Sequence, residues 1–334
     1  DKTHLLSIVS VIFIVLFFTI YTASGFVACA KLFNSVFGLN YHAGLAIGLV
    51  VILCYTITGG YTAVCTTDFI QGSLIFVAFV ISTIIVIFSI GSGNTPVSVS
   101  DVFNNFQTLA GTELQSFNGM GIVSALAWGL GYFGMPHIIV RFMGIRSNSE
   151  IGKARRIGIV WMVISYIGAI LIGTLGTVYL KKYGITLDSV SAETVFSATM
   201  QNMYPAFIAG IFLCAILAAS MSTADSQLLA ASSAVSQDIF KGLIKKDAEE
   251  KDVLNVSRFT VFLIALIALF MSLNPNSSIF SLVSFAWSGF GGTFGPLVLL
   301  ALYWKRTTAA GAIAGLVCGG IVDVIWHYIP SSVA

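Results

Sequence analysis

Long, almost unbroken apolar runs separated by short polar stretches dominate this 334-residue chain. A helix of about 20 residues crosses the ~30 Å hydrocarbon core of a bilayer, and most of the runs reach that length. Because the runs are continuous rather than alternating, they argue against a membrane β-barrel. The pattern predicts an all-α polytopic membrane protein with about nine transmembrane helices. The predicted spans cover residues 5–30, 43–60, 69–91, 119–143, 157–180, 205–238, 256–273, 279–303 and 309–328.

The basic residues indicate how the predicted spans are oriented in the membrane, since cytoplasmic segments of multi-span proteins are enriched in Lys and Arg. One alternating topology puts 13 of the 16 basic residues inside and leaves Lys31, Lys181 and Lys182 outside. It makes residues 92–118 an extracellular loop without Lys or Arg, and residues 239–255 a cytoplasmic loop. The inside residues are Lys2, Arg141, Arg146, Lys153, Arg155, Arg156, Lys241, Lys245, Lys246, Lys251, Arg258, Lys305 and Arg306.

Composition supports the same class of protein. With 57% hydrophobic and 9% charged residues, the chain is not a soluble domain, and its partner is the lipid bilayer. A net charge of +2 gives no sign of nucleic-acid binding. The chain begins at Asp1, and its first apolar run is too long for a signal peptide. We therefore expect a single transmembrane transporter domain over residues 1–334, truncated at its N-terminus.

The sixth predicted span carries the most distinctive chemistry. Ser222, Asp225 and Ser226 are spaced i, i+3 and i+4, so their oxygens share one helical face. An ionisable group inside a membrane is costly and marks a functional site by default. Hydroxyls with a carboxylate, and no Cys or His, suit a hard cation. We interpret the segment as a sodium site; a Ser/Thr-rich contact between helices is the alternative.

The fourth predicted span contains three glycines and a proline at residues 128–136. Proline removes a backbone hydrogen bond and glycine weakens the helix, so this span is expected to break near the midplane. A discontinuous membrane helix is typical of a transporter's binding site. Trp128 and Tyr132, one turn apart, favour this interpretation over a kink that only improves packing. The glycines of the eighth span, residues 289–296, fit a flexing gate or close packing equally well. Asp68 fits a helix N-cap at the start of the third span.

Four motifs occur in order along the chain: FFTIYTASG at residues 17–25, WGLGYFGMPHIIVRF at 128–142, ILAASMSTADSQLL at 216–229 and WSGFGGTFGP at 287–296. Together they resemble the sodium/solute symporter family, and most closely its bacterial sodium/proline branch. The resemblance implies a LeuT-type inverted-repeat helical bundle, in which spans four to eight form the second repeat. Spans one to three would be the last three helices of the first repeat, and we expect the first helices of that repeat to precede residue 1.

The same resemblance implies a function. It predicts a secondary active symporter, not an enzyme, that imports L-proline with Na+ as coupling ion by alternating access in the bacterial cell membrane. Another small carboxylate or metabolite is an alternative cargo, and a membrane sensor that borrows the transporter fold is an alternative role. An intramembrane aspartyl protease using Asp68 and Asp225 is disfavoured. Such enzymes resemble a pattern with Tyr before one Asp and Gly-x-Gly before the other, and neither precedes these two residues. The oligomeric state stays open.

The resemblance also assigns sodium ligands residue by residue. Ser222, Thr223 and the Ala219 carbonyl resemble the ligands of the coupling sodium. Asp68 resembles an acid that joins a second sodium site, whose remaining positions are Asp225 and Ser226 here. Asp225 departs from the family pattern, which carries a hydroxyl there, and it binds either sodium or a proton. The substrate-side residues that the resemblance implies are Tyr21, Trp128, Tyr132 and Pro136.

Overall fold

The computed structural model describes residues 4–91, 119–185 and 193–329, and these residues form helices and no strand. The predicted 92–118 loop lies outside the described residues. The α-helices are α1 (Leu5–Phe37), α2 (Tyr41–Gly91), α4 (Gly119–Gly134), α5 (Pro136–Met143), α6 (Ile151–Lys182), α7 (Val195–Met203), α8 (Ala206–Ser233), α9 (Glu250–Met271), α10 (Ile279–Tyr303) and α11 (Ala309–Tyr328). A short 3-10 helix, η2 (Asn148–Glu150), precedes α6, and a π-helix, η4 (Ala234–Ile244), continues α8.

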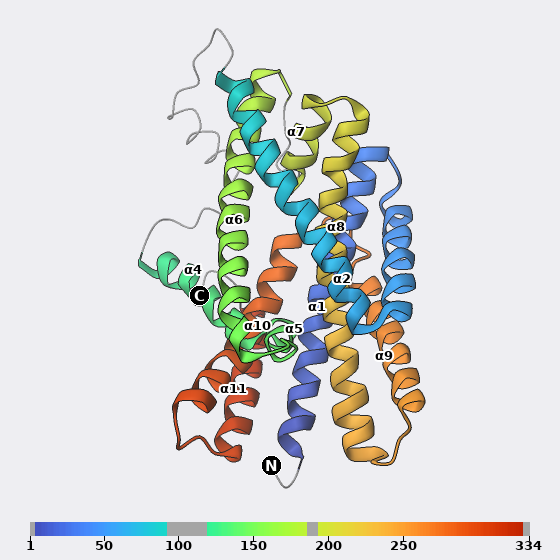
Figure 1. Ribbon diagram of the computed structural model, residues 1–334, viewed down its shortest axis with the longest axis vertical. Coiled ribbons are helices and arrows are strands. Elements are labelled where there is room, and N and C mark those ends of the chain that lie inside the picture. Colours follow the sequence, from blue (N-terminus) through green and yellow to red (C-terminus); the bar gives the residue numbers. More distant parts are fainter. Residues whose placement is uncertain (1–3, 92–118, 186–192, 330–334) are drawn as a thin grey trace.

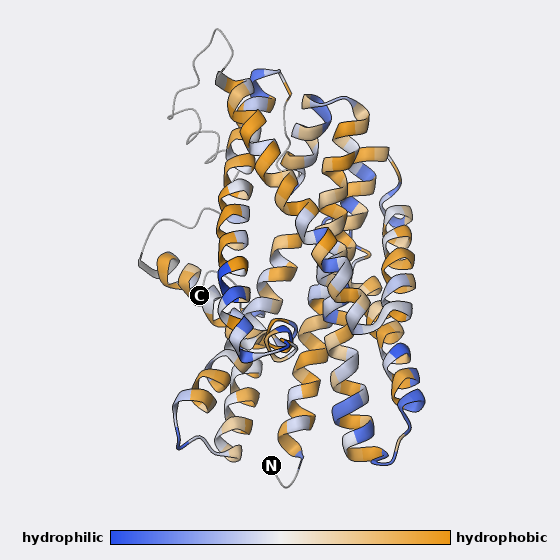
Figure 2. Ribbon diagram, viewed as in Figure 1, coloured by the Kyte–Doolittle hydropathy of each residue, from blue (hydrophilic) through white to orange (hydrophobic). Residues whose placement is uncertain are grey.

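Seven described helices are long and apolar enough to cross a membrane, or eight if the bent pair α4–α5 counts as one span. The long α2 contains a non-helical residue, Gly60, whose φ of +63° is accessible at little cost only to glycine. Its two parts run in different directions (Figure 1). Counting the parts separately gives the nine predicted spans. Hydrophobic residues cover most of the length of these helices, and hydrophilic ones gather mainly at their ends and connections (Figure 2).

Two predicted boundaries differ from the structure. The second part of α2 begins directly after Gly60 rather than at residue 69, so Asp68 lies inside a helix and is not an N-cap. The loop predicted over residues 239–255 is confined to 245–249, because η4 extends to Ile244 and α9 begins at Glu250. In both places polar residues continue a helix instead of ending it.

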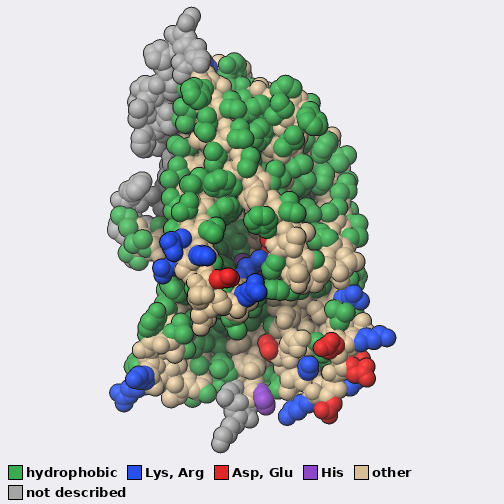
Figure 3. All heavy atoms as spheres, in the orientation of Figure 1, with side chains coloured by type: hydrophobic (Ala, Val, Ile, Leu, Met, Phe, Trp, Pro, Cys, Tyr) green, Lys and Arg blue, Asp and Glu red, His purple; other side chains and the backbone are tan. Residues whose placement is uncertain are grey.

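Several helix connections lie at the two ends of the bundle. The start of α1, the η4–α9 connection and the α10–α11 connection lie at the lower end in Figure 1, and the α1–α2 connection lies toward the upper end. Basic and acidic side chains gather at the lower end of the face in Figure 3 and around a hollow at mid-height, whereas hydrophobic side chains cover its upper part. At the opposite end, Lys31 Nζ pairs with Glu193 Oε2 at 2.6 Å.

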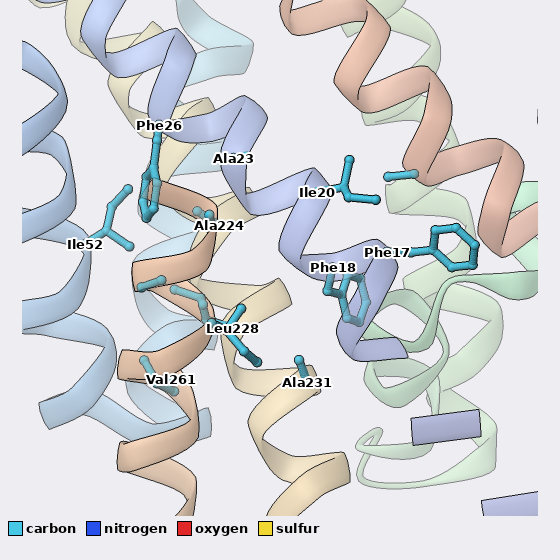
Figure 4. Packing of buried hydrophobic residues seen from close by; sticks show 14 of the residues in the cluster. Phe17, Phe18, Ile20, Ala23, Phe26, Ile52, Ala224, Leu228, Ala231 and Val261 are labelled. Atoms are coloured by element: carbon cyan, nitrogen blue, oxygen red, sulfur yellow. The ribbon is translucent and has the colours of Figure 1, made fainter. Parts of the chain in front are cut away.

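Helix α1 runs through the centre of the hydrophobic core and packs against α2, α8, α9 and α10. Phe17 points toward α10, and Phe26 lies beside Ile52 of α2 (Figure 4). Leu228 and Val261 join α8 and α9 to the same cluster. Because lipid is as apolar as these side chains, close van der Waals contact rather than water exclusion holds such helices together.

The glycines of α4 and α10 bring the two helices into close contact. A Cβ on Gly134 would lie 2.2 Å from the Phe290 carbonyl oxygen, and one on Gly131 would lie 2.5 Å from the Trp287 ring. On the other side of α10, a Cβ on Gly289 would lie 2.2 Å from the Phe17 ring. The glycines of the eighth span therefore serve close packing, and α10 is continuous through Pro296.

Candidate functional site

The fourth span is broken, as predicted, and the break is at a single residue. Helix α4 ends at Gly134, Met135 is extended with φ −81° and ψ 109°, and α5 starts at Pro136. The two helices are bent by 47°. Proline suits this first helical position, since its missing N–H has no partner within a helix there. The break gives residues before and after Met135 different orientations within one span.

Aromatic rings gather before the break, around Trp287 of α10. The Trp128 ring stacks on Trp287 with centroids 5.6 Å apart, and Tyr132 meets it edge-on at 4.9 Å. The Tyr21 ring of α1 lies with its centroid 6.5 Å from that of Trp287. These four residues form the aromatic cluster. Edge-on and offset rings at such distances attract one another, so the cluster is a preformed aromatic surface built from three helices.

The three predicted ligands of the coupling sodium lie together on one turn of α8. Thr223 Oγ1 donates to the Ala219 carbonyl oxygen at 2.8 Å, and Ser222 Oγ donates to the same oxygen at 3.2 Å. The helix is regular here, and the Ala219 carbonyl oxygen is shared by two hydroxyls, which brings three oxygens close together.

One turn further along α8, charged side chains from three helices meet. Arg141 of α5 forms an ion pair with Asp68 Oδ2 of α2 and donates to Ser226 Oγ at 2.7 Å. Ser226 Oγ lies 3.2 Å from Asp68 Oδ2 and 3.3 Å from Asp225 Oδ1. We call Asp68, Arg141, Asp225 and Ser226 the charged cluster. The structure thus brings together the three residues assigned to a second sodium, and adds an arginine.

The charged cluster holds two carboxylates and one guanidinium. Asp225 is completely buried, and among the described residues its Oδ2 has no hydrogen-bond partner. Within the same part of the chain, Asp68 Oδ1 is also buried without a partner. A buried carboxylate is costly unless a cation or hydrogen bonds satisfy it. Both free oxygens are hard ligands, so the side chains of Asp68, Asp225 and Ser226 fit an alkali cation if it replaces Arg141 as their positive partner.

A cavity of about 350 Å³ joins the break to α8. Pro136 and His137 line it from the start of α5, and Arg141 and Ser226 from the charged cluster. Ser226, one turn along α8 from Ser222, therefore faces the same cavity as the first residues after the break.

Known proteins share both the sequence and the architecture. The model of the sodium:solute symporter family matches residues 1–319. The chain belongs to the sodium:solute symporter family. Curated sodium/proline symporters of Staphylococcus aureus, including that of strain Newman, are 43% identical to this symporter-family chain over 332 residues. The matches cover 98% of this chain and 63% of those proteins, so the chain spans less than two thirds of their length.

A solved structure shares the fold of this symporter-family chain. A Na+-coupled sialic acid symporter in a substrate-bound, outward-open state superposes with a TM-score of 0.71 at 17% identity, covering 95% of this chain and 74% of that one. This likeness confirms the expected all-α, LeuT-type bundle of a multi-span membrane protein.

Two residues of the candidate site were not singled out from sequence. Trp287 stands within the fourth motif, yet only its contacts show that it is the centre of the aromatic cluster. Arg141 was counted as one of the cytoplasmic basic residues, but it lies in the last turn of α5 and pairs with Asp68. A positive charge still within an apolar run was the signal that could have distinguished Arg141 from the loop residues.

Proposed function

We propose that the protein is a sodium-coupled symporter that imports L-proline by alternating access. One observation carries the proposal: the start of α5, directly after the break, and Ser226 of the charged cluster on α8 line the same cavity. Discontinuous helices supply both substrate and ion contacts in transporters, since their free ends place helix dipoles within the membrane. The 43% identity to sodium/proline symporters supports this function and this cargo.

The aromatic cluster suits the ring of proline. Trp128, Tyr132 and Tyr21 present ring faces and edges around Trp287, against which a small apolar ring can pack. The carboxylate of the substrate would lie toward the start of α5 at Pro136, where the positive end of the helix dipole favours an anion. Another small carboxylate with an apolar body satisfies the same contacts and is the alternative cargo.

The oxygens of α8 suit sodium as the driving ion. Ala219, Ser222 and Thr223 would ligate the coupling sodium, and Asp68, Asp225 and Ser226 a second cation, which is sodium or, at Asp225, a proton. One charge moving down a potential of 100 mV supplies about 2.3 kcal/mol. Sodium and substrate that favour the same conformations must strengthen each other's binding equally, because linkage is reciprocal.

Uptake by the full-length protein in proteoliposomes tests this function. We expect labelled L-proline to accumulate when a Na+ gradient points inward, and not when choline replaces Na+. Unlabelled proline should compete fully, whereas a set of other small carboxylates should compete weakly. Uptake that is equal without sodium would reject symport, and stronger competition by another solute would identify a different cargo.

A further inference from the structure

The cavity beside the charged cluster is lined by one carboxylate, Asp238, that does not belong to this cluster. Asp238 of η4 lines this cavity together with Arg141 and Ser226. Asp238 is exposed, and among the ion pairs of the described residues none involves Asp238 or its neighbour Lys241. A cation that moves through the cavity can therefore reach Asp238.

The π-helix accounts for the direction that Asp238 faces. At 100° per residue, a regular α-helix would place Asp238 roughly 120° around the axis from Ser226. The wider i→i+5 turns of η4, which begin at Ala234, reduce this angle and turn Asp238 toward the cavity. The π-helical stretch is thus placed where it changes which residue faces the cavity, as such stretches often do at functional sites.

The charges around the cavity are unequal. Three carboxylates lie in or beside the cavity, namely Asp68 of α2, Asp225 of α8 and Asp238 of η4, whereas Arg141 is the guanidinium that lines it. In the structure Arg141 contacts the inner carboxylate, Asp68, through the atoms that a cation would also use: Asp68 Oδ2 and Ser226 Oγ. Arginine and a bound cation cannot occupy these oxygens together.

We propose that Arg141 is a two-position switch with Asp238 as its second acceptor. Arg141 pairs with Asp68 while the charged cluster holds no other cation, and it turns to Asp238 when a cation binds to Asp68, Ser226 and Asp225. The inference rests on the proposed function, because it takes that cation to be the transported Na+. Asp238 is then a positioning residue, which acts on the ion site through Arg141.

Electrostatics gives the reason for the movement. Two positive charges near each other in a protein interior repel far more strongly than in water, so a bound cation favours the outer position of Arg141. The carboxylate of Asp238 compensates the arginine there, which lowers the cost of leaving Asp68. When the cation departs, Arg141 returns to Asp68 and neutralises the inner carboxylate again. Because Arg141 belongs to α5, the switch links ion occupancy to the helix that follows the break.

Substitution of Asp238 in the full-length protein tests the switch. In proteoliposomes, Asp238→Asn should raise the Na+ concentration for half-maximal proline uptake about tenfold, since Arg141 then competes with Na+ more strongly. The half-saturating proline concentration at saturating Na+ should stay as in the wild type. Asp238→Glu should restore the sodium dependence. Asp252→Asn is the matched control, because Asp252 pairs with Lys245 at 2.5 Å and does not line the cavity.

A second readout does not depend on transport. Protection of the detergent-solubilised protein from heat by Na+, without proline, should require about tenfold more Na+ in Asp238→Asn. In an Arg141→Gln background, Asp238→Asn should change neither readout further, because no guanidinium remains to move. Should Asp238→Asn fail to accumulate, Asp238→Ser removes the same charge and allows the same comparison.

The outcomes separate the switch from the function on which it rests. If the wild type shows no sodium-driven uptake of proline, the proposed function is wrong. If it does, an unchanged sodium dependence in Asp238→Asn overturns the switch. An equal additional loss in the Arg141→Gln background also overturns it, because Asp238 would then act independently of Arg141.

Discussion

The aromatic cluster and the charged cluster lie on either side of one helix break, and they are held together by different physics. Ring contacts between α1, α4 and α10 hold the aromatic cluster, where each contact adds a small independent gain. A balance of charges between α2, α5 and α8 holds the other. Removing one ring weakens the first cluster gradually. Removing one charge leaves the second with a buried, unpaired partner.

This difference suggests a division of labour. A packed aromatic surface recognises an apolar molecule without changing its own charge, whereas an unequal set of charges responds to the arrival of an ion. The Met135 break separates the two kinds of surface while keeping both in one span. The variants below test that separation, beginning with the largest expected effect.

Gly134→Ala should separate α4 from α10 and disturb both clusters. Its Cβ would lie 2.2 Å from the Phe290 carbonyl oxygen and 2.9 Å from the Gly295 nitrogen, backbone atoms that cannot rotate away. We expect a loss of stability of about 3 kcal/mol, measured as the shift in thermal unfolding of the purified protein. Gly129→Ala is the control, since its Cβ would meet no atom of the described residues within 4 Å and alanine favours a helix. Equal stability of the two variants would contradict the close contact.

Arg141→Gln should disturb the charged cluster alone. It leaves Asp68 and Asp225 without their cation, and removing one partner of a buried pair commonly costs 3–5 kcal/mol. Because the Arg141 side chain is 36% exposed, water will screen part of this loss. We expect a loss of stability of about 2 kcal/mol, measured in the same unfolding assay. The double variant Arg141→Gln with Asp68→Asn should recover much of it; a double variant worse than the single one would show that charge balance is not the cause.

Trp287→Phe should affect substrate binding and spare the ion site. The smaller ring loses part of its contact with Trp128 and Tyr132, which lie 5.6 and 4.9 Å from Trp287. We expect the half-saturating proline concentration for uptake to rise about tenfold, which corresponds to about 1.4 kcal/mol. The half-saturating Na+ concentration at saturating proline should not change. A matching change in both would indicate that the two clusters are not separate.

Thr223→Ala should weaken sodium binding and spare substrate binding, with a smaller effect than that of Trp287→Phe. It removes one of the two hydroxyls at the Ala219 carbonyl oxygen, and a single such contact is worth about 1 kcal/mol. The half-saturating Na+ concentration should rise about fivefold, with proline affinity at saturating Na+ retained. Thr223→Ser, which keeps the hydroxyl, should behave as the wild type. An unaltered sodium dependence in Thr223→Ala would remove this residue from the ion site.

The spans and the break were predictable from sequence because they are local. Continuous apolar runs define the helices, and glycines with Pro136 mark the interruption within residues 128–136. The partners of these features were not predictable. Asp68 and Arg141 are 73 residues apart, and no periodicity connects them. Gly60 was likewise indistinguishable from other glycines, since its positive φ is a property of the folded backbone.

The hydroxyl of Ser226 has a single proton and two acids beside it. At any instant the O–H bond points to Asp68 or to Asp225, and the other acid accepts no hydrogen bond from Ser226. The rotation of one bond thereby decides which acid the hydroxyl stabilises. Since Asp68 already has Arg141 as its partner, Asp225 gains more from this hydroxyl, and an arriving ion would meet two acids of unequal surroundings.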